Sequence, residues 1–235
     1  MADVAVLKLG GSVLTDLDAY RTTARFLRDE VIRTQLRIVA VVSAQEGHTD
    51  QLREDAAVLA EDPESDALDL LWSTGELRSV ALLTLALRAE GVAAAGFNVH
   101  ETGLRVSQGD LTLNPLSLRA ALGRCEVVVV PGFLATNRQQ IVTLGRGGSD
   151  WSAVALAAAL GAVRCELIKD VPGYFTADPH TSTDASLIDQ LTYATALAMA
   201  DDGCPLVQRQ AIDHAQRAQL PLIVRSFDSS GTRVA

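Results

Sequence analysis

The sequence predicts an α/β fold, a three-layer αβα sandwich with a mostly parallel central sheet. Short apolar runs, typical of buried strands, alternate along the chain with longer stretches of helical periodicity. Hydrophobic residues make up 48% of the chain but aromatic residues only 4%, as expected for aliphatic strands covered by alanine-rich helices. Because no long linker, internal repeat or low-complexity tract interrupts the pattern, we expect a single domain over residues 1–235.

In the first half of the chain, strands are expected at residues 4–9, 38–42 and 92–97, and helices at 18–34, 54–71 and 77–90. Asp62-Pro63 should interrupt the second helix. Residues 73–76 should precede the third helix, which would place Glu76 near its first turn, where the helix dipole stabilises a carboxylate. Residues 103–113 predict a β-hairpin or an irregular lobe around Gln108-Gly109-Asp110.

In the second half, the continuous β-branched run at residues 126–130 is the best candidate for a central strand. The polar segment 135–140 predicts a turn, and Ser149 or Asp150 is expected to cap a helix that runs through Ala159. The remaining elements are a short helix at 117–122, strands at 165–168 and 222–226, and helices at 192–200 and 206–218.

Charge and composition argue against several classes of protein. A net charge of −9 disfavours a nucleic-acid surface, which needs a basic field, although nucleotide binding needs only a few local cations. No run of about 18 apolar residues and no signal peptide is found, so we expect a soluble cytoplasmic protein with no membrane partner. The cysteines Cys125, Cys165 and Cys204 lack metal-ligand spacing, which predicts reduced thiols and no protein metal site.

The first strand ends in a phosphate-type turn. Lys8 lies at the carboxyl end of that strand, where ligands collect in open α/β sheets, and Gly10, Gly11 and Ser12 follow it. Lys8 is either an ordinary strand-edge lysine or a cation for a phosphoryl group, and the adjacent glycines favour the second. The turn is not a Walker A loop, because the lysine precedes the glycines.

Residues 143–161 predict an anion-binding turn that enters a helix. Gly147 and Gly148 have no Cβ, so the backbone can approach a ligand closely, and the helix N-terminus favours negative charge. Arg146 adds a planar cation suited to a carboxylate or a phosphate.

Two further loops follow predicted strands. In residues 43–50, Thr49 and Asp50 either cap the next helix or face a ligand. Residues 169–179 form a long loop shaped by proline and glycine, in which Tyr174 and Phe175 offer apolar faces.

Taken in order, these segments resemble the amino acid kinase family and, within it, the catalytic domain of aspartate kinase. The resemblance covers nearly the whole chain, and it rests on order and spacing more than on any one motif. Its motifs are Lys8-Leu9-Gly10-Gly11-Ser12, the loop from Val42 to Asp50, Gly75-Glu76, Pro131-Gly132-Phe133, Thr143 to Asp150, and the loop from Lys169 to Pro179.

The resemblance implies transfer of the γ-phosphoryl group of ATP to the side-chain carboxylate of L-aspartate, with Mg²⁺ as cofactor. Such an acceptor is already ionised at pH 7, so the reaction needs no histidine or cysteine base, and none is placed for it. The reaction needs alignment and neutralisation of the phosphoryl charge instead. The resemblance also implies a homodimer, with a substrate lobe at about 1–142 and a nucleotide lobe at about 143–235.

Residue roles follow from the same resemblance. Lys8 would contact the phosphoryl group, and Asp150 would orient Lys8. Arg146 would grip the α-carboxylate of aspartate, and Glu76 its α-amino group. Ser43, Thr49, Gly147 and Gly148 would complete the substrate site, and Gly10, Gly11, Ser12, Lys169, Asp170, Tyr174 and Asp178 would bind the nucleotide.

The sequence departs from the family pattern at several positions. The first loop has Gly-Gly-Ser-Val where aspartate kinases usually have Gly-Gly-Thr-Ser-Val, and His180 replaces an arginine. Pro205 stands where the family carries a lysine near the nucleotide, so Lys169 or Arg209 could supply that cation. Nothing resembling a regulatory ACT domain follows, which predicts a core without that feedback. The departures leave two alternatives open, a kinase of another carboxylate, carbamate or phosphate, and a non-catalytic binding protein.

Overall fold

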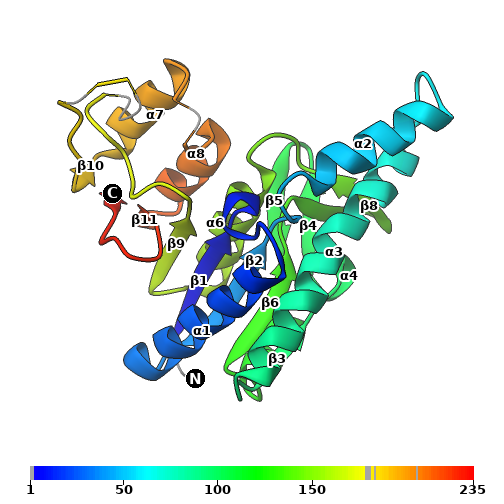
Figure 1. The fold of residues 1–235 in the computed structure, drawn as a ribbon, viewed down its shortest axis with the longest axis horizontal. Coiled ribbons are helices and arrows are strands. Elements are labelled where there is room, and N and C mark those ends of the chain that lie inside the picture. The colour runs from blue at the N-terminus through cyan, green and yellow to red at the C-terminus, as the bar shows by residue number, and fades with distance from the viewer. Residues whose placement is uncertain (1–2, 178–180, 183, 205) are drawn as a thin grey trace.

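A computed structural model describes residues 3–177, 181–182, 184–204 and 206–235 of the chain. Within these residues, an eight-stranded sheet runs through the molecule in the order β10-β12-β11-β9-β1-β2-β6-β3 (Figure 1). The neighbours from β11 to β3 pair in parallel, whereas β12 lies antiparallel to β11, so the predicted mostly parallel sheet is confirmed. The strands are β1 (Val4–Leu9), β2 (Arg37–Val42), β3 (Ala94–Gly96), β6 (Val127–Pro131), β9 (Arg164–Ile168), β10 (Gln190–Leu191), β11 (Leu222–Arg225) and β12 (Thr232–Val234).

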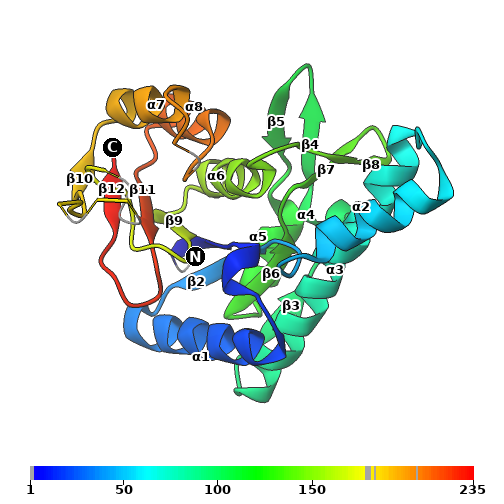
Figure 2. The same ribbon diagram turned by 45° about the horizontal axis from the view of Figure 1, so that its top comes forward.

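Helices cover both faces of this sheet (Figure 2). One face is covered by α1 (Leu17–Thr34) and α3 (Ser65–Ala89), and the other by α5 (Leu116–Leu122), α6 (Gly148–Leu160), α7 (Tyr193–Asp201) and α8 (Arg209–Arg217). Two more helices are α2 (His48–Leu59), which packs on α3, and the short α4 (Val99–Thr102). The three-layer αβα architecture is therefore confirmed.

The two apolar cores follow from the period of two in the strands. In β1, Val6 belongs to the core under α6, whereas Leu7 and Leu9 belong to the core under α1 and α3. Since both faces of the sheet are covered, the strands β1, β2 and β6 are mostly apolar, as parallel strands usually are.

A second sheet of four strands, in the order β5-β4-β7-β8, packs beside α6. Its strands are β4 (Leu104–Ser107), β5 (Asp110–Leu113), β7 (Leu134–Asn137) and β8 (Gln140–Thr143). The hairpin predicted at residues 103–113 is confirmed. The turn predicted over residues 135–140 is wrong, because β7 and β8 pair as far as Asn137 and Gln140, and two residues are enough to join them.

Helix α3 differs from the prediction. Asp62-Pro63 does separate α2 from α3, but α3 then runs without a break for 25 residues, so residues 73–76 lie inside it. Glu76 is therefore far from the first turn, and the helix dipole does not explain it. Gly75 allows a close approach, because a Cβ there would lie 3.1 Å from Cδ2 of His48 and 3.2 Å from Cβ of Ala44.

Helix α3 is also the one helix in the described part of the chain that is long and apolar enough to cross a membrane. Length and composition are a weak indication, because core helices of soluble proteins share them. Here α3 packs against α1, β6 and β8.

Two other expectations need correction. Helix α6 begins at Gly148 with Gly147 as its N-cap, and no side chain caps it, because the Asp150 carboxylate contacts lysines instead. Strand β6 lies one place from the β3 edge, and β9, β1 and β2 hold the middle of the sheet.

The sheet has a topological switch point at β1. The carboxyl ends of β1, β2 and β9 meet at one edge, since these strands are parallel neighbours. The connection from β1 to β2 runs through α1 on one face, whereas α6 leads into β9 from the other face. Diverging connections leave a crevice at such a point, and ligands of open α/β sheets bind there.

Candidate active site

Three charged side chains form an ion-pair cluster in this crevice. Nζ of Lys8, from β1, lies 2.8 Å from Oδ1 of Asp150 in the first turn of α6. Nζ of Lys169, just after β9, donates a hydrogen bond of 2.7 Å to the other oxygen, Oδ2. The side chains are only 8%, 4% and 14% exposed for Lys8, Asp150 and Lys169. The cluster therefore holds two ammonium groups on one carboxylate, with a surplus of positive charge.

The ionisation of the cluster follows from its contacts. Burial by itself would raise the pKa of Asp150, but the charges and hydrogen bonds of Lys8 and Lys169 outweigh burial and hold this pKa below its usual value. Burial lowers the pKa of Lys169, and Lys8 lowers it further, while Asp150 opposes both. Asp150 thus stays ionised and holds the two lysines in place.

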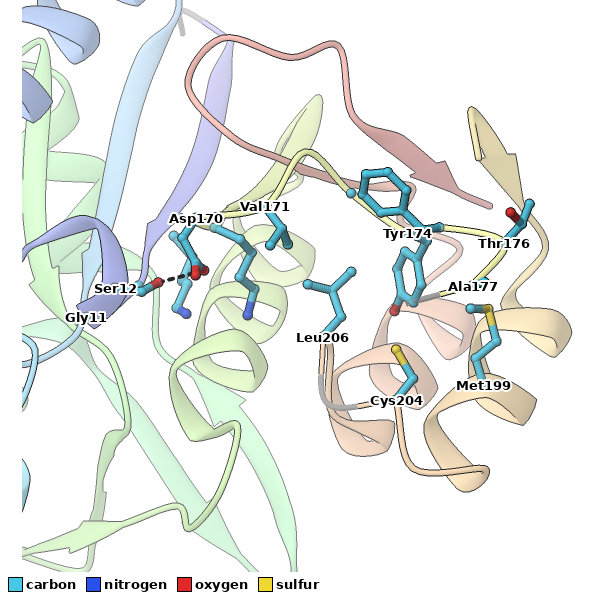
Figure 3. A pocket seen from close by; sticks show the side chains of 15 residues that line it. Gly11, Ser12, Asp170, Val171, Tyr174, Thr176, Ala177, Met199, Cys204 and Leu206 are labelled. Atoms are coloured by element: carbon cyan, nitrogen blue, oxygen red, sulfur yellow. Dashed lines mark hydrogen bonds between the residues drawn. The ribbon is translucent and has the colours of Figure 1, made fainter. Parts of the chain in front are cut away.

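A cavity of about 750 Å³ opens on one side of the cluster, and we call it the β9-side cavity. Among the predicted nucleotide residues, it is lined by Lys8, Gly10, Gly11, Ser12, Lys169, Asp170 and Tyr174. Figure 3 shows that its far end is apolar, with Val171, Met199, Cys204 and Leu206 around Tyr174. This apolar end has the character expected of a site for a flat, uncharged ring system.

The glycine turn forms the near wall of this cavity. A Cβ at Gly11 would lie 2.9 Å from the carbonyl oxygen of Ala44, so only glycine fits there. The hydroxyl of Ser12 donates to Oδ1 of Asp170 at 2.9 Å, which ties the turn to the loop after β9 (Figure 3).

A second cavity, of about 550 Å³, lies on the other side of the cluster, and we call it the α3-side cavity. Five predicted substrate residues line it, namely Thr49, Glu76, Arg146, Gly147 and Gly148. Lys8 and Lys169 line both cavities, so the two meet at the ion-pair cluster. Ser43 lies one step behind the wall, where its hydroxyl donates to that of Ser149 at 3.0 Å, and Ser149 lines the cavity.

Glu76 is a buried carboxylate with an unsatisfied oxygen. It is 4% exposed, and its Oε2 has no hydrogen-bond partner among the described residues. Burial raises the pKa of Glu76 to about 8, although the backbone amide of Ala44 and the charge of Lys8 both oppose this. A buried carboxylate of this kind is stabilised by a cation that a ligand brings.

The turn that carries Arg146 is held in place by its neighbours. Both the backbone N–H and the hydroxyl of Thr143 donate to Oδ1 of Asp69 in α3, at 3.2 and 2.6 Å. Gly147 has φ 72° and packs under Gln208, whose Cγ would lie 2.1 Å from a Cβ at Gly147. Arg146 itself is exposed and lines the cavity, which leaves its guanidinium accessible to a ligand.

Several lining residues were not among the predicted site residues, although Phe133 and Phe175 belong to segments that the sequence analysis singled out. Trp72, Phe133, Arg53 and Gln208 line the α3-side cavity, and Phe175, Met199, Cys204 and Leu206 the β9-side cavity. The four-residue spacing between Trp72 and Glu76 could have revealed Trp72, had the continuous helix been recognised. Nothing local in the sequence distinguishes Gln208 or Met199, which reach the site only through tertiary packing.

Some predicted positions lie elsewhere. Asp178, predicted to bind the nucleotide, lies outside the described residues, as do His180 and Pro205. Arg209 lines neither cavity and forms ion pairs with Asp201 and Asp213, whereas Lys169 lines both cavities. Of the two cations that could replace the family lysine, only Lys169 is in position.

No group of three or more His, Cys, Asp or Glu side chains suited to a metal ion occurs in the described part of the chain. The cysteines Cys125, Cys165 and Cys204 are all free thiols.

Comparison with known proteins gives consistent matches. The sequence profile described as the amino acid kinase family matches residues 3–226. An aspartokinase from Thermus thermophilus is 39% identical over 229 residues, which cover 95% of this chain and 56% of that protein. The chain therefore spans about half the length of the curated relatives it matches.

Solved structures agree. The crystal structure of aspartate kinase from Synechocystis superposes with a TM-score of 0.89 at 34% identity, covering 100% of this chain and 40% of that one. E. coli aspartokinase III in complex with aspartate and ADP superposes with a TM-score of 0.81 at 27% identity, covering 99% of this chain and 64% of that one.

Proposed function

Because this chain belongs to the amino acid kinase family, we propose that it transfers the γ-phosphoryl group of ATP to the side-chain carboxylate of L-aspartate. One observation carries the choice of acceptor. The α3-side cavity holds a buried, unpartnered carboxylate oxygen on Glu76 together with the guanidinium of Arg146. An α-amino acid matches this pair, since its ammonium group satisfies Glu76 and its α-carboxylate meets Arg146. An acceptor without an ammonium group would leave Glu76 unsatisfied.

The two cavities divide the reaction between them. ATP occupies the β9-side cavity, with its base at the apolar end near Tyr174 and its phosphates at the Gly10–Ser12 turn. Aspartate occupies the α3-side cavity, and its reacting carboxylate points to the cluster of Lys8, Asp150 and Lys169 where the cavities meet. The two ammonium groups neutralise charge on the transferring phosphoryl group, which is the main requirement of phosphoryl transfer.

The side chains of the site suit a reaction without a protein base. The attacking carboxylate is ionised at neutral pH, so no proton has to be removed. One oxygen of that carboxylate forms a bond to phosphorus while the bond from phosphorus to the bridging oxygen of ADP breaks, which gives an acyl phosphate and ADP. Asp150 takes no part in proton transfer, because Lys8 and Lys169 keep it ionised.

Mg²⁺ fits the same crevice. Asp170 lines the β9-side cavity, and its Oδ1 already accepts a hydrogen bond from Ser12. One carboxylate together with substrate phosphates is a usual Mg²⁺ environment. We assign Asp170 as the protein group that would hold Mg²⁺, and the ion would supply positive charge to neutralise the phosphates.

The relatives support this proposal. The aspartokinase relatives match almost the whole of this chain, and the E. coli protein is solved with aspartate and ADP. The cytoplasmic location, the homodimer, and the division into lobes at about residue 142 stay predictions.

A coupled assay with a panel of acceptors tests the function. Purified protein, Mg-ATP and each amino acid are incubated with hydroxylamine, which traps an acyl phosphate as a hydroxamate, and ADP release is followed in parallel. We expect a hydroxamate with L-aspartate, and a much smaller signal with succinate, which lacks the ammonium group. A signal with another carboxylate, a carbamate or a phosphate acceptor would reassign the substrate. Thermal stabilisation by ATP without turnover of any acceptor would instead indicate a binding protein.

A further inference from the structure

Trp72 places a second unsatisfied polar group in the α3-side cavity. Its indole Nε1 is buried, and no described residue accepts a hydrogen bond from it. Trp72 lines the same cavity as Glu76. A buried N–H without an acceptor destabilises the folded protein, so the group gains most from a ligand that brings an acceptor.

Helix α3 aligns this donor with the Glu76 carboxylate. Trp72 and Glu76 are four residues apart on an unbroken helix, so their side chains lie on one face, about one turn from each other. The same face of α3 thus offers the cavity a free donor on Trp72 and a free acceptor on Glu76. The zwitterion of an α-amino acid carries the complementary pair, an ammonium group and a carboxylate, on one carbon atom.

The neighbours of Trp72 indicate which carboxylate it meets. Its ring packs against Phe133, with centroids 6.5 Å apart. Phe133 in turn adjoins the Arg146 turn, because a Cβ at Gly148 would lie 3.1 Å from Cδ2 of Phe133. Trp72 is therefore connected to the arginine side of the cavity, where the α-carboxylate is expected, and not to the lysines, which must face the reacting carboxylate.

The backbone of Phe133 fixes this arrangement. Phe133 has φ 63°, which is uncommon for an aromatic residue, and its N–H donates to the hydroxyl of Ser152 at 3.1 Å. Because the surroundings hold Phe133 in this conformation, its ring is a fixed support for Trp72.

From this arrangement we propose that Trp72 is a specificity residue whose indole N–H donates a hydrogen bond to the α-carboxylate of the acceptor amino acid, beside Arg146. The inference rests on the proposed function, since it assumes an α-amino acid in the α3-side cavity. Trp72 and Arg146 would then bind the α-carboxylate of the substrate, while Glu76 binds its ammonium group.

The variant Trp72→Phe tests the assignment, because it keeps an aromatic ring and removes the N–H. We expect the KM for L-aspartate to rise about ten- to a hundred-fold, as for a lost hydrogen bond to a charged group, while kcat and the KM for ATP stay within about two-fold. The inhibition constant of 3-aminopropanoate, which is aspartate without its α-carboxylate, should be the same for the variant and the wild type. An equal loss of affinity for both compounds would show a packing effect and overturn the assignment.

Trp151→Phe is the matched control. It removes the other of the two tryptophans in the chain, whose Nε1 already donates to Nδ1 of His214 at 3.2 Å and which lines neither cavity. We expect lower thermal stability but an unchanged KM for aspartate.

In the Trp151→Phe variant, Trp72 is the single tryptophan of the chain, so its fluorescence can report substrate binding without turnover. Adding L-aspartate to Trp151→Phe should change the tryptophan emission saturably, with a midpoint near the KM. No change in emission, together with an unchanged KM in Trp72→Phe, would overturn the inference while the proposed function stands. If the wild type neither binds nor phosphorylates L-aspartate, both proposals fall.

Discussion

The two cavities of the crevice share their central lysines but differ in the kind of walls they have. The β9-side cavity is closed by apolar side chains such as Val171, Met199 and Leu206, from the loop after β9, from α7 and from the segment before α8. The α3-side cavity is lined by charged and polar groups, among them Glu76 and Arg146, from α3 and the turn before α6. The ion-pair cluster thus lies between a cavity with an apolar end and a cavity lined mainly by charged and polar groups.

Binding free energy and specificity therefore arise differently in the two cavities. An apolar wall binds a ring by burying its surface, and the binding free energy changes little when one apolar side chain of the wall replaces another of similar size. Buried polar groups without partners discriminate strongly, because a wrong ligand leaves them unsatisfied. We therefore expect sequence changes in the β9-side cavity to affect activity mildly, and changes in the α3-side cavity to redefine the acceptor.

The largest effect should come from the cluster that both cavities share. Lys8→Ala removes one of the two ammonium groups from the transferring phosphoryl group, and we expect kcat to fall about 100- to 1000-fold with much smaller changes in either KM. Steady-state kinetics with each substrate varied in turn measures this. Circular dichroism and thermal melting check the fold, because Lys8 also pairs with Asp150. Equal loss in kcat and in both affinities would contradict a role of Lys8 that is specific to the transition state.

The pH dependence of aspartate binding tests whether charge dominates in the α3-side cavity. Glu76 has a pKa of about 8 in the free protein, so it is mostly protonated at pH 6 and must ionise before it can hold an ammonium group. We expect affinity for L-aspartate to rise by about ten-fold per pH unit between pH 6 and 8, and affinity for ATP to change little. Calorimetry in buffers of different ionisation enthalpy should record proton release on binding, and Glu76→Gln should abolish it. A flat profile in the wild type would place the ammonium group elsewhere.

The raised pKa of Glu76 also affects the stability of the folded protein. Whereas affinity for L-aspartate should rise with pH, this contribution to stability should fall. Because the pKa of Glu76 is raised from 4.5 to about 8 on folding, its contribution to stability is complete below about pH 4.5 and is lost as the pH rises to 8. Glu76→Gln should therefore gain stability relative to the wild type across this interval. Urea unfolding at several pH values measures the difference.

Arg146→Ala should give an effect confined to one cavity. Arg146 is exposed, so water screens its attraction for the α-carboxylate, and we expect the KM for aspartate to rise about ten-fold while the KM for ATP is unchanged. Arg146→Lys should recover only part of the loss, because an ammonium group cannot bind a carboxylate with two parallel hydrogen bonds. An equal rise in the KM for ATP would contradict the separation of the two cavities.

The smallest effect is expected at the apolar end of the β9-side cavity. The hydroxyl of Tyr174 is buried without a partner in the described part of the chain, and burial, with Cys204 and Asp150 adding to it, raises the pKa of Tyr174. If this hydroxyl meets the nucleotide base, Tyr174→Phe should raise the KM for ATP about three- to ten-fold and leave the KM for aspartate unchanged. Competition with adenosine and with guanosine would show whether the hydroxyl also selects the base.

Local sequence signals were enough to predict the layers and the strand ends. Alternating apolar runs predicted the parallel sheet, and the glycines at positions 10, 11, 147 and 148 marked turns where a ligand could approach. These signals are local, since a strand period, a glycine turn or a charged residue after a strand can be read within a few positions.

The contacts between side chains from distant segments depend on the tertiary structure. The local sequence offered Asp150 as a helix cap, and only the family resemblance implied that it orients Lys8. In the structure Asp150 pairs with both Lys8 and Lys169, because β1 and β9 are neighbours and both end beside α6. Glu76 was expected in a first turn, but α3 continues through it, and Gly75 beside it lets the loop after β2 pack closely on the helix. The physical reason is common to both: backbone conformation depends largely on nearby residues, whereas the partner of a buried charge depends on which distant strands lie side by side.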